Sequence, residues 1–246
     1  MTNKNKTVII LGSEGALGSE LIQELLSKNT FDIVAVDQNK NSQFSKKKIR
    51  YYQADFSKPQ EIKSLLKKLN GISRPLWGGR EGLLLISTMG KFGNDHEKEE
   101  MNFNSILETI RINLLGVAQT CLEICNQCVT QNKKLRIVIV GSTAGFVGSR
   151  DIGYGISKSG LNGLVLSMSK CFAKKNITII GVNPGIFESA MSTSVSKQRQ
   201  QSVISNTHLK RTGTVSEISN TVLYAALTAP DFLTGSLINI NGGQYS

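Results

Sequence analysis

The chain has 246 residues, of which 39% are hydrophobic and 23 are glycine, and its formal net charge is +11. This composition is typical of a globular domain with many tight turns and excludes disordered and fibrous proteins. The longest apolar runs are only as long as a strand, so no membrane-spanning segment is predicted. The apolar run after residues 1–6 is too short for a signal peptide, and we therefore expect a cytoplasmic protein.

The excess of positive charge suits nucleic acids, acidic membrane surfaces and anionic substrates alike. The only sharp run of lysines covers residues 46–48, and it lacks the interleaved aromatic side chains of a nucleic-acid face. We interpret this run as a solvated loop. We therefore expect neither a nucleic-acid partner nor a membrane partner, and leave an anionic substrate open.

An apolar strand over Thr7–Leu11 runs into a glycine-rich loop at residues 12–18, and an apolar-periodic helix follows. Strand, glycine loop and helix are the context of a dinucleotide-binding fingerprint. The glycines let the backbone approach a pyrophosphate, which amides at the helix N-terminus then hold. The spacing is G-x-x-G-x-x-G, so a plain strand-to-helix turn is the alternative for this loop taken by itself.

A second strand, Ile33–Val36, ends at Asp37, nineteen residues after Gly18. An acidic side chain at this place accepts hydrogen bonds from the adenosine ribose and repels the 2′-phosphate of NADP. Glu14 adds to that repulsion. The pattern predicts a site for NAD, with NADP as the second choice because Lys40 is near.

Strands and helices continue to alternate along the chain. Further strands are expected at residues 49–53, 82–87, 136–140, 177–182 and 236–240, and helices from a Ser57–Gln60 capping box to Gly71, over 105–130, from Tyr154, and from a Thr214–Glu217 capping box. The fold class is therefore α/β: a single doubly wound Rossmann-type domain over residues 1–246, with a mostly parallel, seven-stranded sheet. Residues 190–212 are polar and weakly periodic, which indicates a substrate loop.

Three of the four cysteines, Cys121, Cys125 and Cys128, repeat along one stripe of the helix at 105–130. No histidine or acidic residue stands beside them at metal-ligand spacing. Because buried thiols behave as small apolar residues, we interpret the stripe as core. We predict neither disulfides nor a metal site.

Tyr154 and Lys158 are four residues apart and therefore lie on the same side of a helix. An ammonium near a phenol favours the phenolate and lowers the tyrosine pKa, which makes Tyr154 a candidate proton donor and acceptor. By itself, such a pair is more often a solvated one. An apolar stripe follows on this helix, and we expect it to be buried: Leu161, Leu164, Val165, Met168, Cys171 and Phe172.

Together these residues resemble the short-chain dehydrogenase/reductase family over essentially the whole chain. The matching positions are the loop at 12–18, Asp37, Asp55, Asn113, Ser142, Tyr154, Lys158, Pro184, Gly185, Leu233–Gly235 and Asn241–Gly243. Their order and spacing carry the resemblance. It implies an NAD(P)-dependent oxidoreductase that transfers hydride between the cofactor and a secondary alcohol or ketone, in a homodimer or homotetramer formed through the helices at 105–130 and 154–174.

The resemblance also implies a role for each matching residue. Tyr154 is the general acid/base at the substrate oxygen, and Lys158 lowers its pKa and binds the nicotinamide ribose. Ser142 holds the substrate oxygen, and Asn113 supports a water relay to Lys158. The implied cofactor contacts, with Asp55 at the adenine end, are Gly12, Ser13, Gly15, Ala16, Leu17, Gly18, Asp37, Asp55, Phe56, Tyr154, Lys158, Pro184, Gly185, Ile186 and Ser189.

Two departures from the family pattern stand out. Ser87-Thr88-Met89-Gly90 replaces the usual Asn-Asn-Ala-Gly, whose asparagine side chains brace the centre of the sheet. We therefore expect this replacement to affect local stability more than chemistry. Ala16 replaces a glycine of the commonest loop, and the resulting spacing resembles members that act on nucleotide sugars. An epimerase or dehydratase that recycles NAD is therefore an alternative, and a non-catalytic NAD-binding protein is another.

The substrate is the least determined part of the prediction. Five basic residues fall in or near the expected substrate loops, namely Arg150, Lys197, Arg199, Lys210 and Arg211. They make a phosphorylated or carrier-linked acyl substrate conceivable, although ordinary surface charge explains them equally well.

Overall fold

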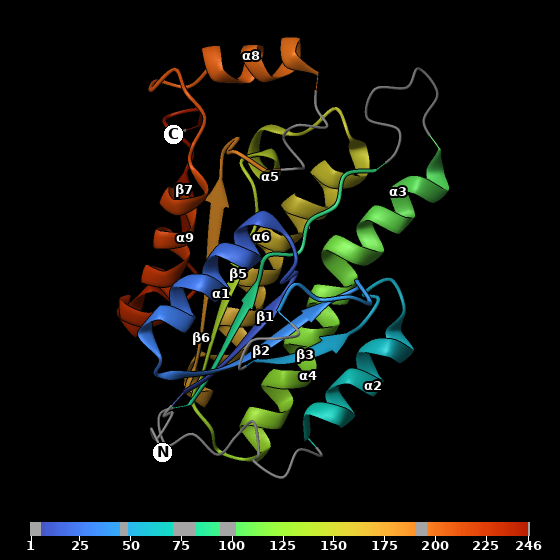
Figure 1. The fold of residues 1–246 in the computed structure, drawn as a ribbon, viewed down its shortest axis with the longest axis vertical. Helices are drawn as coiled ribbons and strands as arrows, with labels where there is room; N and C mark the ends of the chain where they lie inside the picture. Colours follow the sequence, from blue (N-terminus) through green and yellow to red (C-terminus); the bar gives the residue numbers. More distant parts are fainter. Residues whose placement is uncertain (1–5, 45–48, 71–81, 94–101, 190–195, 246) are drawn as a thin grey trace.

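The computed structural model describes residues 6–44, 49–70, 82–93, 102–189 and 196–245 (Figure 1). In these ranges seven strands form one sheet in the order β3-β2-β1-β4-β5-β6-β7, and all neighbouring strands are parallel. The strands are β1 (Lys6–Leu11), β2 (Phe31–Asp37), β3 (Arg50–Gln53), β4 (Leu83–Ser87), β5 (Leu135–Val140), β6 (Ile177–Pro184) and β7 (Leu237–Ile240). The predicted fold class is confirmed.

Helices cover both faces of this sheet (Figure 1). One face carries α1 (Ala16–Lys28) and α9 (Val215–Leu223), and the other carries α2 (Pro59–Asn70), α4 (Gly116–Thr130) and α6 (Ile152–Phe172). Strand side chains alternate between the two cores, so β1 sends Ile9 to one core and Ile10 to the other. Burial on both faces explains why the strands are continuous apolar runs in the sequence.

The remaining elements are short or lie at the ends of longer helices. They are α3 (Phe103–Ile110), the π-helical turns η1 (Arg111–Leu115) and η3 (Tyr224–Thr228), α5 (Ala144–Val147), α8 (Lys197–Ser205) and the 3-10 turns η2 (Ala173–Lys175) and η4 (Asp231–Leu233). None of the helices in the described residues is long and apolar enough to cross a bilayer. Within the same residues, no three His, Cys, Asp or Glu side chains gather as a metal site would require.

The strand order reverses between β1 and β4, because the chain runs outward through β2 and β3 before it crosses back. In open parallel sheets, ligands bind in the crevice outside the carboxyl ends of the strands at this reversal. Gly12 follows β1 and Thr88 follows β4, so the glycine loop and the Ser87–Gly90 segment both border the crevice.

The helix predicted over residues 105–130 is interrupted. It begins as α3 at Phe103, passes through the π-helical turn η1, and continues as α4. Asn113 lies at the centre of η1. Cys121, Cys125 and Cys128 are buried in the core, as predicted.

Other predictions need correction. Residues 197–205 of the expected loop at 190–212 form helix α8, and residues 190–195 and the lysine run at 46–48 lie outside the described residues. Cys171, placed on the buried stripe of α6, is exposed. The Ser57–Gln60 capping box is wrong, because the Ser57 hydroxyl donates to Asp55 Oδ1 at 2.7 Å, whereas the Thr214–Glu217 box is confirmed.

Candidate active site

The glycine loop closes too tightly for side chains at two positions. Gly12 has φ +79°, and a Cβ atom on it would lie 2.9 Å from Thr88 Oγ1. A Cβ atom on Gly18 would lie 2.2 Å from the Gly12 carbonyl oxygen. Gly15 is the N-cap of α1 and brings no side-chain cap to the first amides of the helix. Such uncapped amides at a helix N-terminus are suited to a phosphate, so the loop fits the pyrophosphate of a dinucleotide.

Thr88 connects this loop to the end of β4. Its Oγ1 atom lies 2.9 Å from the carbonyl oxygen of Leu11 and 3.0 Å from that of Gly12. The Thr88 amide also donates to Leu11 O at 2.9 Å. The departure from the usual family tetrapeptide therefore keeps a polar brace between β1 and β4.

Two carboxylates lie at the outer end of the crevice. Asp37 accepts the amides of Glu14 (3.0 Å) and Asn39 (3.3 Å). Glu14 accepts the hydroxyl of Ser42 at 2.6 Å and the amide of Gln43 at 3.4 Å. Asp37 is thus held by the glycine loop and the β2–β3 connection, and Glu14 is held by that connection. The hollow between them is lined by Gly12, Glu14, Gly15, Asp37, Gln38, Asn39, Phe56, Thr88, Met89, Gly90, Lys91 and Ile112.

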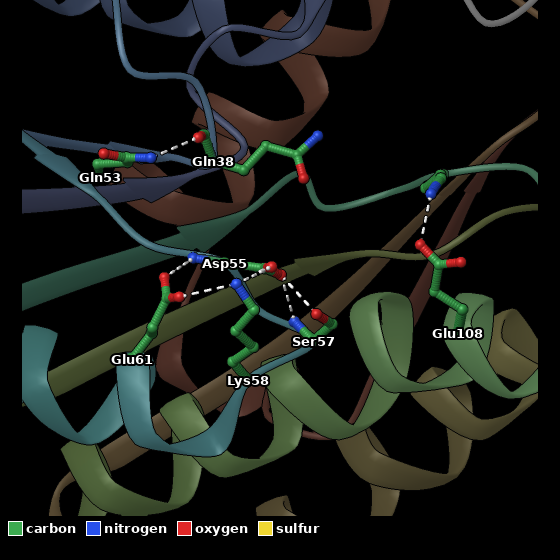
Figure 2. Close-up of polar contacts among 8 residues, drawn as sticks. Gln38, Gln53, Asp55, Ser57, Lys58, Glu61 and Glu108 are labelled. Atoms are coloured by element: carbon green, nitrogen blue, oxygen red, sulfur yellow. Dashed lines mark hydrogen bonds and ion pairs between the residues drawn. The ribbon is translucent and has the colours of Figure 1, made fainter.

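The Asp55 carboxylate lies at the start of α2, and its predicted contact with the adenine stays a prediction. The carboxylate accepts the amide (2.9 Å) and the hydroxyl (2.7 Å) of Ser57 and pairs with Lys58 at 3.1 Å (Figure 2). Burial works to raise the pKa of Asp55, but the hydrogen bonds from Ser57 and Lys58 outweigh it and hold the pKa below its usual range. Phe56, the next residue, does line the hollow.

The Ser13 side chain does not line the crevice. The residue is fully buried, and its amide donates to Val36 O at 3.2 Å. Its hydroxyl is buried without a hydrogen-bond partner among the described residues. Ser13 thus anchors the loop to the end of β2 through its amide.

The middle of the crevice gathers most of the predicted site. Ala16, Leu17, Ser142, Lys158 and Ser189 line one hollow there, together with Gly15, Gly18, Thr88, Gly90, Val140, Gly141, Tyr154, Pro184, Gly185 and Phe187. These residues come from the loop after β1 and from the ends of β4, β5 and β6, with Tyr154 and Lys158 from α6. Phe187 is a lining residue that the sequence did not single out.

Lys158 is held by backbone carbonyl groups at the ends of two strands. Its Nζ donates to Met89 O at 3.0 Å and to Val140 O at 3.1 Å, and it lies 5.6 Å from the centre of the Tyr154 ring. Burial lowers the pKa of Lys158 to about 8. The ammonium therefore stands beside the tyrosine, as the spacing predicted, and titrates near neutral pH.

The pKa of Tyr154 moves in the opposite direction to the expected one. Burial raises it, a hydrogen bond with Ser142 lowers it, and the negative charge of Asp151 raises it further. The predicted lowering is thus wrong for the protein alone, because burial of the phenol is the largest cause and it raises the pKa. A raised pKa keeps Tyr154 protonated at neutral pH, in the state that donates a proton.

Asp151 is a buried carboxylate that sequence reasoning missed. One oxygen accepts the amide of Tyr154 at 2.9 Å and so caps α6, and the other accepts the amide of Gly93 at 2.6 Å. It therefore joins the segment after β4 to the start of the Tyr154 helix. The available signal was an aspartate three residues before Tyr154, at the place where an N-cap is expected.

Asn113 does not line either hollow, although it lies next to them. Its side chain accepts the amide of Lys91 at 2.9 Å and donates to the carbonyl of Lys91 at 2.8 Å and to Ser157 Oγ at 3.2 Å. The π-helical turn places this fully buried side chain between the segment after β4 and α6. Asn113 therefore positions Lys91, and its part in a water relay stays a prediction.

Beyond Tyr154, a further cavity adjoins the middle hollow. Five of its residues are large and apolar or aromatic, namely Phe92, Val147, Ile186, Phe187 and Val203, and it is completed by Ser142, Thr143, Ala144, Gly148, Ser149, Tyr154, Gly185, Ser189 and Gln244. The Phe92 ring lies 4.5 Å from the Tyr154 ring, centre to centre. Val203 comes from α8, so the helix that was predicted as a loop contributes a wall.

The basic residues considered for an anionic substrate do not reach this cavity. Arg211 pairs with Glu217 at 2.6 Å, and no charged side chain of the described residues lines the cavity. Arg150, Lys197 and Lys210 are likewise not among its lining residues, and the side chain of Arg199 lies outside the described part.

Comparisons with known proteins agree with this fold. A family model described as short chain dehydrogenase matches residues 6–200. The 3-oxoacyl-(acyl-carrier-protein) reductase FabG of Buchnera aphidicola subsp. Schizaphis graminum is 28% identical over 250 residues, covering 100% of this chain and 99% of that one. The structure of 4-hydroxyisoleucine dehydrogenase complexed with NADH has a TM-score of 0.86 at 25% identity, with 98% of each chain covered. ElxO with NADP bound shares the fold, with a TM-score of 0.82, 22% identity and 98% of each chain covered.

Proposed function

Because the chain belongs to the short-chain dehydrogenase family, we propose that it is an NAD(P)-dependent oxidoreductase that interconverts a secondary alcohol and a ketone. The observation that carries the proposal is the position of Ser142 and Tyr154. Both residues line the middle hollow of the crevice and also the cavity beyond it. A nicotinamide in the first space and a carbonyl group in the second would meet at the Tyr154 hydroxyl.

The residues of the chain suit the proton transfer of such a reaction. A nicotinamide supplies or removes the hydride when it is bound. During reduction, Tyr154 donates its proton to the substrate oxygen, and Ser142, which already hydrogen-bonds Tyr154, holds that oxygen in place. The Lys158 ammonium is anchored on Met89 O and Val140 O and stabilises the phenolate left behind.

NAD is the cofactor that the outer hollow favours. The 2′-phosphate of NADP would face Asp37, which accepts the amide of Glu14, and Glu14, which accepts hydrogen bonds from Ser42 and Gln43. One structural relative carries NADH and another carries NADP, so the fold admits both. NADH and NADPH titrations of the protein, followed by nicotinamide fluorescence, compare the two affinities directly.

The walls of the substrate cavity favour an alkyl or acyl ketone. Phe92, Val147, Ile186, Phe187 and Val203 bury apolar surface of a ligand, and no charged side chain of the described residues faces it. The curated relative named as a 3-oxoacyl-(acyl-carrier-protein) reductase points to the same class. A sugar substrate, as in the epimerase alternative, would need more polar walls.

Replacing Tyr154 by phenylalanine tests the proposal. The phenylalanine ring fills the same space without the hydroxyl, so ketone-dependent oxidation of NADH is expected to fall by at least ~100-fold, the range general acids contribute. Binding of NADH, measured by fluorescence, is expected to change little. Turnover that survives this substitution would remove Tyr154 from the reaction, and NADH binding without turnover of any ketone by the unaltered protein would favour the non-catalytic alternative.

A homodimer or homotetramer is the assembly we infer from the surface. Leu122 of α4 and Ile156 and Leu166 of α6 are exposed on the outer sides of these helices, as is Leu115 of η1. Exposed apolar side chains concentrated on one side of a protein mark interaction surfaces. Two copies that pair through α4 and α6 would cover them.

A further inference from the structure

Asn183 is a polar residue with no exposed surface, at the end of a strand that is buried along its whole length. Its side-chain oxygen, Oδ1, accepts the amide of Ser142 at 3.0 Å. A buried polar side chain is unfavourable unless it makes hydrogen bonds that the fold or the site requires. The bond to Ser142 is therefore the feature of Asn183 that needs an explanation.

The segment after β5 is tied to the end of β6 on either side of Ser142. Gly141 and Thr143 donate their amides to main-chain oxygens of β6, at 2.8 Å and 2.9 Å. The Ser142 amide lies between these two bonds, and β4, the strand on the other side of β5, has already ended at Ser87. The Asn183 side chain thus gives the Ser142 amide the partner that a neighbouring strand would otherwise supply.

Asn183 also lies directly over the backbone of Gly141. A Cβ atom on Gly141 would overlap Asn183 Oδ1, so this contact requires a glycine there. Glycine leaves the backbone before Ser142 more freedom to rotate than any other residue would. The hydrogen bond to Oδ1 therefore fixes the direction in which the Ser142 side chain leaves the chain.

That direction matters because of what the Ser142 hydroxyl contacts. It accepts the amide of Ala144 at 3.1 Å and forms a hydrogen bond with Tyr154. Ser142 also lines both the middle hollow and the cavity beyond Tyr154. A rotation of the Ser142 backbone would carry the hydroxyl away from the phenol and from both spaces.

We propose that Asn183 is a positioning residue, which acts through the Ser142 amide to aim the Ser142 hydroxyl at Tyr154 and at the substrate oxygen. The inference rests on the proposed function, because it takes Ser142 and Tyr154 as the groups that bind the reacting oxygen. Asn183 is not among the residues that line the two spaces, so its effect on the reaction passes through Ser142.

The test measures the pKa of Tyr154 without any turnover. The five tyrosines of the chain are replaced by 3-fluorotyrosine, and the Tyr154 signal, assigned by its loss in Tyr154→Phe, is followed against pH by ¹⁹F NMR. The hydrogen bond with Ser142 lowers this pKa. Asn183→Ala is therefore expected to raise it by about one pH unit, the shift that one hydrogen bond supports. Asp151 and Lys158, the charged groups beside Tyr154, are the same in every variant.

Three further variants separate positioning from a loss of structure. Ser142→Ala is expected to raise the Tyr154 pKa by the same amount, and adding Asn183→Ala to it should cause no further change. Asn162→Ala is the matched control, because it removes another buried amide, on α6, and should leave the pKa unchanged. Asn183→Leu refills the space and takes the place of Asn183→Ala if the alanine variant does not fold.

Four results would each overturn the inference: a Tyr154 pKa that does not rise in the Asn183 variant, an equal rise in Asn162→Ala, a second rise when Asn183→Ala is added to Ser142→Ala, or failure of both Asn183 variants to fold. Alcohol oxidation with NAD⁺ and ketone reduction with NADH separate the two proposals. The expected pKa pattern without turnover of any alcohol or ketone refutes the proposed function only. Turnover with a Tyr154 pKa that is independent of Asn183 refutes the role of Asn183 only.

Discussion

At the scale of single residues, the site is a set of buried groups whose pKa values are displaced by burial and by one another. Burial raises the pKa of Tyr154 and lowers that of Lys158 to about 8. The two pKa values, which ordinarily lie close together, are therefore pushed apart. Groups that are tuned in this way and share a crevice are typical of acid–base catalysis.

Asp151 is expected to set the pH at which Tyr154 works. Its negative charge raises the pKa of Tyr154, so removing the charge in Asp151→Asn should lower that pKa. Oxidation of an alcohol needs the phenolate, and its kcat/KM should rise with pH through the Tyr154 pKa. In Asp151→Asn this rise is expected at a lower pH, because the negative charge that raises the Tyr154 pKa is gone. Asparagine can still accept the Tyr154 amide, so the substitution removes the charge and keeps that hydrogen bond.

The matched control is Asp231→Asn, which removes a carboxylate that pairs with Lys134 and Arg136 far from the crevice. The Asp231→Asn variant should leave the pH dependence of kcat/KM unchanged. A profile that stays unchanged in Asp151→Asn, or moves to higher pH, would show that the Asp151 charge does not act on Tyr154.

At the scale of elements, the crevice depends on the close approach of the glycine loop to α1. In Gly18→Ala, the new methyl group would lie 2.2 Å from the Gly12 carbonyl oxygen. We expect this variant to lose NADH binding and stability, because the loop must open to admit the methyl group. NADH fluorescence titration and urea unfolding measure the two effects.

Gly163→Ala provides the matched control on α6. Nothing lies within 4 Å of a Cβ atom at Gly163, so alanine there should stabilise the protein by about 1 kcal/mol through its helix propensity and leave NADH binding unchanged. Wild-type NADH affinity in Gly18→Ala would contradict the assignment of the loop as the cofactor site.

Much of the fold could be predicted because β1, β4, β5 and β6 are buried on both faces and are therefore continuous apolar runs. The π-helical turn η1 was not predicted, since such turns are rare within helices and the helix was expected to run unbroken over residues 105–130. The polar helix α8 was missed because it has no regular apolar stripe.

Within the site, positions set by local sequence were predicted better than orientations set by tertiary contacts. The Gly12–Gly18 loop and the Tyr154–Lys158 pair are local patterns, and the structure brings them to one crevice. The Asp55 carboxylate turns to Ser57 and Lys58, and Gln244 lines the cavity from the turn after β7. Neither orientation has a signal in the spacing of residues.

At the scale of the whole molecule, the outer sides of α4 and α6 make the assembly testable. Leu122→Lys combined with Leu166→Lys would place like charges where two copies meet, on a chain of net charge +11. We expect the unaltered protein to sediment as a dimer or tetramer and this variant as a smaller species. Phe232→Lys, at a residue that is 98% exposed on η4, should keep the dimer. A monomeric unaltered protein would refute pairing through these helices.

The central claim is that the crevice brings a hydride to the carbonyl carbon of a substrate and the Tyr154 proton to the oxygen of the same carbonyl group. It is tested most directly by incubating the protein with a ketone and NADH deuterated at the transferring position, and analysing the alcohol by mass spectrometry. We predict one deuterium on the carbinol carbon for each NAD⁺ formed. An alcohol without deuterium, or a product formed with no net consumption of the deuterated NADH, would contradict the claim.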